Sequence, residues 1–187
     1  MSAGDVRTDG ELVIALRDEG DTMAFEVLMK RHERPLYGFI VRQLGDRSSA
    51  QDVYQQTLLR ILDRIDTVSS PEAFRPWAFG IASNLCKNHR RSQPPGHARA
   101  ELDGLASGLP SPEAATAQRE TATQIAQALE RLPEAQREVF VLYHYTRLSY
   151  EEIAGATGAP LGTVKSRMNA ALSQLRTLLA SLAEDAR

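Results

Sequence analysis

The chain has little of several features that mark other classes of protein. It holds one cysteine, Cys86, among 187 residues, which excludes an internal disulfide and is typical of a reducing compartment. No window alternates apolar and polar residues with β-branched enrichment, so no sheet is expected. No apolar run approaches the roughly 18 residues that span a bilayer, and the first residues lack the apolar stretch of a signal peptide. We therefore expect a cytoplasmic protein without membrane insertion.

Signatures of catalysis are also missing. The sequence contains no glycine-rich phosphate loop, no Ser or Cys nucleophile motif and no His-Glu metal motif. Cys86 and His89 lie one helical turn apart, but two ligands without partners do not make a zinc site. Glu151 and Glu152 fall in the first turn of an expected helix, where the helix dipole favours acids. We expect no catalytic residue, no metal and no cofactor.

Helical periodicity fills most of the chain. Between its two helical parts, residues 92–111 are rich in Pro, Gly, Ser and Ala and lack large apolar residues at helical spacing, which is typical of a flexible linker. The expected fold is all-α, with two small helical domains at 1–92 and 112–187 and a linker at 93–111. In the first domain we expect helices from Thr8 or Asp9 to Glu19, from Asp21 to Leu44 with a kink or break at Pro35, from Ser48 or Ser49 to about Ile65, and from about Pro76 to Arg91.

The stretch from Ser149 to Asn169 predicts a helix-turn-helix. Ser149 and Glu152 have the spacing of a capping box, and Gly158 suits the turn between the helices. Beyond the turn, Val164 and Met168 belong to an apolar stripe, whereas Lys165, Ser166 and Asn169 fall off it. Such a second helix fits a DNA major groove. An ordinary helical hairpin is the structural alternative.

A second basic segment lies in the first domain. From Ala73 to Ala100 the chain has no acidic residue. Asn84, Lys87, Asn88 and Arg91 recur at three- and four-residue steps, and this face could follow a phosphate backbone and present amides to bases. The alternative is a solvated basic face, and for Trp77 and Phe79 a core position is the favoured interpretation.

Together the two halves resemble an extracytoplasmic-function (ECF) sigma factor of the sigma-70 superfamily. The segment FEVLMKRHERPLYGFIVRQLGDRSSAQDVYQQTLLRIL, followed by FRPWAFGIASNLCKNHRR, is similar to sigma region 2. The segment LERLPEAQREVFVLYHYTRLSYEEIAGATGAPLGTVKSRM is similar to sigma region 4. The resemblance implies a promoter-specificity subunit of RNA polymerase that is not itself an enzyme, recognises and opens promoter DNA, and is bacterial and cytoplasmic.

The resemblance also implies partners and site residues. Core RNA polymerase would be bound through its β′ clamp and β flap, and an anti-sigma factor is an expected partner. The family's clamp-facing segment usually carries acids at the positions of Gln51 and Gln56, and its recognition helix often carries an arginine at Ala170. The implied polymerase-binding residues are Asp52, Gln55, Gln56 and Arg60; the -10 set is Phe74, Arg75, Asn84, Lys87, Asn88 and Arg91; the -35 set is Thr163, Lys165, Ser166, Arg167 and Asn169.

Two rival functions remain at this point. A conventional DNA-binding regulator would place a helical sensor domain before the helix-turn-helix and bind duplex DNA without polymerase. A helical enzyme or adaptor would need a deep polar pocket within about residues 21–91, for which the sequence offers no residues.

Overall fold

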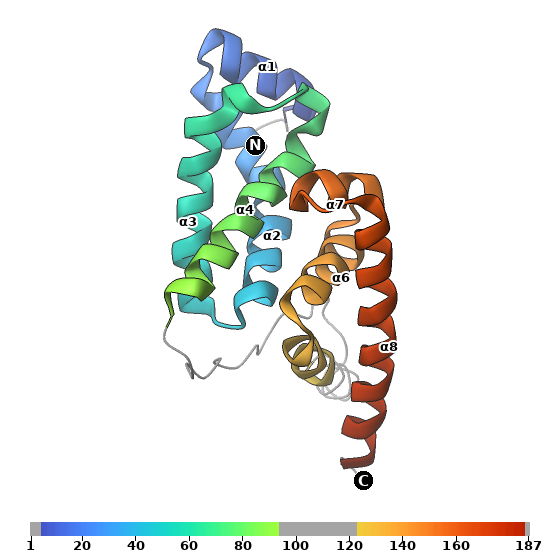
Figure 1. Cartoon of the computed structure of the whole chain (residues 1–187). Coiled ribbons are helices and arrows are strands. Elements are labelled where there is room, and N and C mark those ends of the chain that lie inside the picture. Colours follow the sequence, from blue (N-terminus) through green and yellow to red (C-terminus); the bar gives the residue numbers. More distant parts are fainter. Residues whose placement is uncertain (1–4, 94–122, 186–187) are drawn as a thin grey trace.

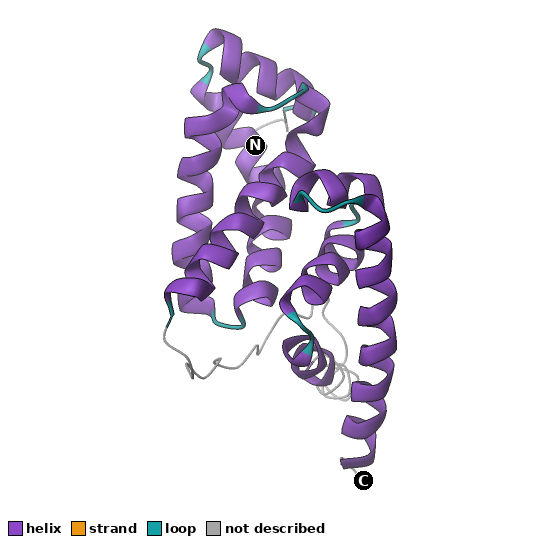
Figure 2. Ribbon diagram, viewed as in Figure 1, coloured by secondary structure: helices purple, strands orange, loops and turns teal. Residues whose placement is uncertain are grey.

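The computed structural model describes residues 5–93 and 123–185 (Figure 1). Within these ranges all regular structure is helical (Figure 2), as expected for an all-α fold. None of the helices described is long and apolar enough to cross a membrane. Most of the predicted linker, and the predicted start of the second domain at residue 112, lie outside the described residues.

Each half of the chain supplies its own helices. In the part of the chain that the structure describes, a helical segment at 123–131 comes first in the second half. The elements of the first half are α1 (Asp9–Glu19), α2 (Thr22–Leu44), α3 (Arg47–Arg64), the short 3-10 turns η1 (Ile65–Thr67) and η2 (Pro71–Ala73), and α4 (Phe74–Ser92). Those of the second half are α6 (Glu134–Thr146), α7 (Tyr150–Thr157) and α8 (Leu161–Asp185).

Helix boundaries follow local capping chemistry, with two corrections. Thr8 caps α1 in a capping box with Glu11, within the predicted alternatives. Of the kink or break predicted at Pro35, the break is wrong, because α2 runs without interruption from Thr22 to Leu44. The predicted caps of α3 are also wrong. The Asp46 carboxylate accepts hydrogen bonds from the backbone N–H groups of Ser48 and Ser49, so both serines lie inside the helix.

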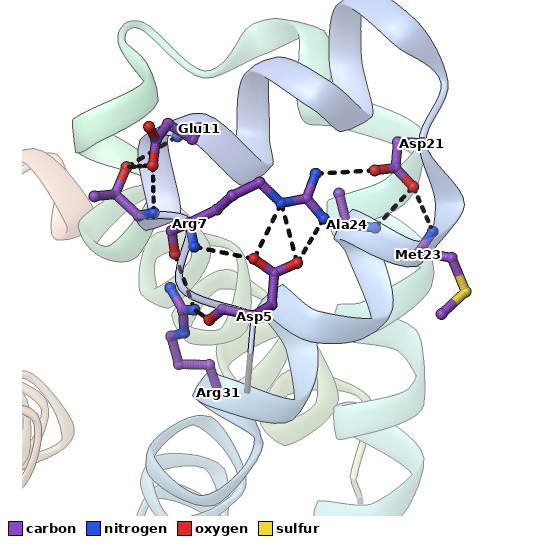
Figure 3. A network of polar contacts seen from close by, with 8 residues as sticks. Asp5, Arg7, Glu11, Asp21, Met23, Ala24 and Arg31 are labelled. Carbon is purple, nitrogen blue, oxygen red and sulfur yellow. Dashed lines mark hydrogen bonds and ion pairs between the residues drawn. The ribbon is translucent and has the colours of Figure 1, made fainter. Parts of the chain in front are cut away.

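A network of polar contacts ties the N-terminal segment to α2 (Figure 3). The Arg7 guanidinium lies between two carboxylates, 2.6 Å from Asp5 and 3.0 Å from Asp21. Hydrogen bonds from Arg7 lower the pKa of Asp5 to about 2. Arg31 donates to the carbonyls of Asp5 and Arg7. These contacts hold the segment before α1 against the first turns of α2.

The two halves share one hydrophobic core. Helix α6 packs against α2, and α7 packs against α4 (Figure 1). Buried side chains of α6, α7 and α8, including Leu142, Ile153 and Val164, belong to the same cluster as those of α1 to α4. A second cluster, which contains Leu132 and Leu175, lies within the second half alone. The sequence predicted the two helical halves, but not that they dock onto each other.

Candidate nucleic-acid interface

The helix-turn-helix forms as its sequence predicts. The Ser149 hydroxyl accepts from the Glu152 backbone N–H at 3.1 Å, and the Glu152 carboxylate accepts from the Ser149 N–H at 2.7 Å. Gly158 ends α7 with φ 68°, a left-handed conformation that costs glycine nothing. Val164 and Met168 are buried, so the inner face of α8 is committed to the core. This packing determines which side of α8 faces solvent.

The predicted base-reading residues lie on that open side of α8. Lys165, Ser166 and Asn169 are exposed, and Thr163 and Arg167 are half-buried beside them. The second and third turns of α8 therefore present an ammonium, a hydroxyl and an amide together. These groups can hydrogen-bond to base edges and phosphates.

The polar face of α4 is divided between solvent and the second half. Asn84, Asn88 and Arg91 are exposed. Lys87 is half-buried, and its Nζ lies 2.9 Å from a carboxylate oxygen of Glu138 on α6. Three of the four residues that the sequence placed on this face are thus open, and the fourth carries an ion pair with the second half.

The two remaining members of the predicted -10 set differ. Arg75 is half-buried at the start of α4. Phe74 is completely buried, with its ring centroid 5.6 Å from His32 and 6.0 Å from Trp77. The Phe74 ring cannot stack on a base from this position, so we correct its assignment to a core residue. Phe79 is also buried, which agrees with the core interpretation.

Helix α3 presents a third face. Asp52, Gln55, Gln56 and Arg60 are all exposed on it. Leu59 is 69% exposed, which is unusual for a leucine. A depression of about 420 Å³ lies beside it, lined by Gln56, Leu59, Arg60, Asp63 and Leu85. An apolar side chain ringed by polar groups is typical of a protein-docking surface.

Cys86 and His89 do not form a functional pair. Cys86 is buried, and burial raises the pKa of its thiol to about 12, so the reactive thiolate is disfavoured. In the part of the chain that the structure describes, no cluster of three or more His, Cys, Asp or Glu residues is placed to hold a metal ion.

Comparison with known protein families matches both halves. Residues 28–94 match the model described as Sigma-70 region 2, and residues 122–175 match Sigma-70, region 4. The RNA polymerase sigma-H factor of Pseudomonas aeruginosa is 32% identical over 89% of this chain and 92% of its own length. The ECF RNA polymerase sigma factor SigW of Bacillus subtilis is 30% identical over 88% of this chain and 93% of its own length.

The chain belongs to the ECF sigma factors of the sigma-70 family. It therefore directs promoter-specific transcription initiation, as a specificity subunit of RNA polymerase. Helices α2 to α4 carry region 2, and the helix-turn-helix belongs to region 4.

Solved structures of sigma factors share the fold. CnrH, in complex with the cytosolic domain of CnrY, superposes with a TM-score of 0.69 at 26% identity, over 92% of this chain and 97% of that one. The sigma factor RpoE of Bartonella quintana, in complex with the anti-sigma factor NepR, gives a TM-score of 0.60 at 25% identity, over 78% and 89% of the two chains. Each relative was therefore solved with a bound protein partner.

Three residues between the two halves of this sigma factor escaped the sequence analysis. Glu138 is 2% exposed although it is an acid, and Ser83 donates a hydrogen bond to it from α4. Gly80 lies where α4 meets α7. A glycine inside a helix costs about 1 kcal/mol relative to alanine, and such a glycine usually has a packing reason. A glycine inside an expected helix was therefore the only feature of the sequence that pointed to this contact.

Proposed function

We propose that this sigma factor divides promoter recognition between α4 and α8. The observation that carries the proposal is that each region of the family presents one polar, partly basic helix face: α4 in region 2 and α8 in region 4. A single DNA-reading helix would suit many regulators. Two such faces in one chain suit a protein that recognises two separate promoter elements.

The face of α8 reads the -35 element as duplex DNA. Lys165, Ser166 and Asn169 contact base edges in the major groove, while Thr163 and Arg167 hold the phosphate backbone. Their exposure at the start of α8 supports these roles.

The face of α4 binds the -10 element and its non-template strand. Asn84 and Asn88 contact bases, and Lys87 and Arg91 contact phosphates, with Arg75 at the start of the helix. Capture of an unstacked base repays part of the free energy of strand opening.

The exposed face of α3 docks on the β′ clamp of core RNA polymerase, and region 4 docks on the β flap. Asp52, Gln55, Gln56 and Arg60 supply the polar contacts around Leu59. Gln51 and Gln56 are amides where acids are common, so their hydrogen bonds to a basic clamp lack the charge assistance that roughly doubles the strength of such a bond. An anti-sigma factor is the second proposed partner, because both solved relatives described above are held by a partner chain. The protein acts in the cytoplasm, where the polymerase works.

Reconstitution with core RNA polymerase tests this function. The purified chain should co-elute with core and yield promoter-dependent transcripts from a library of genomic fragments. Core alone is the control. Failure to bind core and to start transcription would overturn the proposal. Specific duplex binding by the free chain at the affinity of the holoenzyme would favour the rival DNA-binding regulator.

Substitution of Lys165 tests the -35 assignment. Lys165→Ala should weaken promoter binding by the holoenzyme by about 1–3 kcal/mol and relax preference at one -35 base pair. Arg176→Ala is the matched control, because Arg176 is an exposed cation of the same helix outside the reading set. Binding to promoters with single -35 substitutions gives the readout. An unchanged preference would remove Lys165 from the set.

A further inference from the structure

Arg147, at the end of α6, has a backbone conformation that suits glycine. Its φ is 58°, and among the described residues it is the one residue other than glycine with a positive φ. Three glycines of the described part share this conformation, and each also ends a helix: Gly20 ends α1, Gly45 ends α2 and Gly158 ends α7. A residue with a Cβ is strained there, because the Cβ approaches a backbone carbonyl oxygen. The end of α6 thus carries a strained arginine where the other such helix ends carry glycine.

No contact within the fold explains an arginine at this position. The side chain of Arg147 is exposed, and in the ranges that the structure describes no hydrogen bond or ion pair holds its guanidinium. Its backbone N–H donates to the carbonyl of Tyr143 at 3.1 Å, a bond that glycine would make equally well. Backbone strain that the fold itself does not use is typical of functional positions. The guanidinium is therefore available to a partner outside the chain.

The position of Arg147 relative to the recognition helix indicates this partner. Arg147 precedes Ser149, the N-cap of α7, by two residues, whereas the opposite end of α7 turns through Gly158 into α8 (Figure 1). The eight residues of α7 span about 12 Å, which equals the width of the DNA major groove of about 12 Å. In helix-turn-helix proteins the first helix crosses the DNA backbone while the second lies in the groove. With the first half of α8 at the base edges, Arg147 therefore lies beside the phosphates that border the groove.

The charge around α7 also singles out this arginine. Between Arg137 and Lys165 the sequence holds one Lys or Arg, which is Arg147. Arg137 itself is buried. The first turn of α7 carries two acids, Glu151 and Glu152, which repel a phosphate. A first helix that crosses the DNA backbone therefore depends on Arg147 to offset the negative charge that it meets.

We propose that Arg147 is a further promoter contact of this chain, which binds a backbone phosphate beside the -35 element while α8 reads the bases. The planar guanidinium can donate two parallel N–H bonds to phosphate oxygens. Such a contact carries no sequence information, so it adds affinity and fixes the orientation of α7 on the duplex. It also adds a cation to a recognition surface whose helix α8 has none between Arg167 and Arg176. This inference rests on the proposed -35 role of α8.

Three variants separate the charge of Arg147 from its backbone strain. Arg147→Lys keeps both, Arg147→Gln keeps the strain without the charge, and Arg147→Gly removes both. Thermal unfolding of the free full-length chains should give equal Tm values for the wild type, Arg147→Lys and Arg147→Gln. The Tm of Arg147→Gly should equal that of the wild type or exceed it by up to about 4 °C, because glycine has this φ without strain. A lower Tm in Arg147→Gly would show that the arginine stabilises the fold, and would overturn the inference.

Promoter binding by the holoenzyme is the central measurement. The probe is a duplex promoter that the wild-type holoenzyme transcribes, titrated from about 50 to about 200 mM salt. Arg147→Gln and Arg147→Gly should bind more weakly at the low salt concentration, and loss of one phosphate contact should lower the slope of log K against log salt by about 0.9. Their deficit should therefore shrink about 3.5-fold across this range, whereas Arg147→Lys should keep the wild-type slope. The loss should be the same on promoters with single -35 substitutions, unlike that of Lys165→Ala.

The outcomes separate a phosphate contact from a polymerase contact and from the proposed function. A wild-type salt slope in both Arg147→Gln and Arg147→Gly would overturn the phosphate contact, while a relaxed -35 preference in Lys165→Ala would leave the proposed function intact. Weaker binding of the two variants to core polymerase without DNA, at an unchanged salt slope, would assign Arg147 to the polymerase instead. A wild-type holoenzyme that starts no transcripts would overturn the proposed function, whatever the variants of Arg147 do.

Discussion

At the scale of single residues, two neighbouring alanines of α8 have opposite environments. Ala170 is exposed next to the proposed -35 set, whereas Ala171 is completely buried in the cluster with Leu175. Ala170→Arg should therefore add one phosphate contact, strengthen promoter binding and steepen the salt dependence of log K by about 0.9. Ala171→Arg should instead destabilise region 4 by roughly 2–4 kcal/mol, because it buries a charge in apolar packing.

Binding across a salt series and urea unfolding of both variants check this pair. An unchanged salt slope in Ala170→Arg, together with wild-type stability in Ala171→Arg, would contradict it.

The burial of Ala171 also explains why this position carries no arginine, which the sequence alone could not decide. Exposed polar positions such as Lys165 and Asn88 were predictable from helical periodicity, whereas the burial of Phe74 depends on helices distant in sequence.

At the scale of single elements, the turn of the helix-turn-helix depends on one glycine. Gly158 has φ 68°, which strains any residue with a Cβ, so Gly158→Ala should destabilise region 4 by about 1–2 kcal/mol. Gly162→Ala, four residues on in the first turn of α8, should be neutral or stabilising by up to about 1 kcal/mol, because its Cβ meets open space. Urea midpoints measure both. Equal midpoints for the two variants would show that the turn does not need this conformation.

The start of α3 gives a second element-scale prediction. Asp46→Ala should cost about 0.5–2 kcal/mol, because two backbone N–H groups lose their acceptor. Ser48→Ala, at an exposed position of the same turn, should change stability by less than about 0.5 kcal/mol. Hydrogen bonds from Ser49 lower the pKa of Asp46 from its usual 3.8, so this stabilisation is present above that pH and is lost as pH falls through the lowered value. Thermal unfolding at neutral and acid pH measures both effects, and a larger loss in Ser48→Ala would contradict the assignment.

Elements whose ends are fixed by adjacent residues were predictable from the sequence. The Ser149–Glu152 capping box and the Gly158 turn need only neighbours in the chain, and both were predicted. At Pro35 the sequence left a kink and a break open. The helix is not broken there, because the packing of the flanking turns against other helices outweighs the one missing hydrogen bond. Local rules therefore predict caps and turns well, and they fail where tertiary packing decides.

At the scale of the whole molecule, the contact between the halves was beyond the sequence. In the sequence, Glu138 is an ordinary polar position of an amphipathic helix. Only the structure places Ser83 and Lys87 opposite it. The composition of residues 92–111 predicted a linker between the helical halves, but the composition of a connecting segment carries no information on which faces meet. The shared core now predicts that the two halves unfold together in the free chain.

Trp77, the single tryptophan, reports on this coupling from α4. Leu175→Ala removes apolar volume from the cluster confined to region 4 and should cost that region about 2–5 kcal/mol. In the docked wild-type background it should also lower the urea midpoint of Trp77 fluorescence, because loss of region 4 removes part of the core around region 2. In a Gly80→Ala background, the added carbon would lie 2.8 Å from the backbone carbonyl oxygen of Ala156 and should separate α4 from α7. In that background Leu175→Ala should leave the Trp77 midpoint unchanged, while circular dichroism records an earlier transition for region 4. If Leu175→Ala leaves the Trp77 midpoint unchanged in both backgrounds, the halves unfold independently. The shared core would then add no measurable stability to region 2.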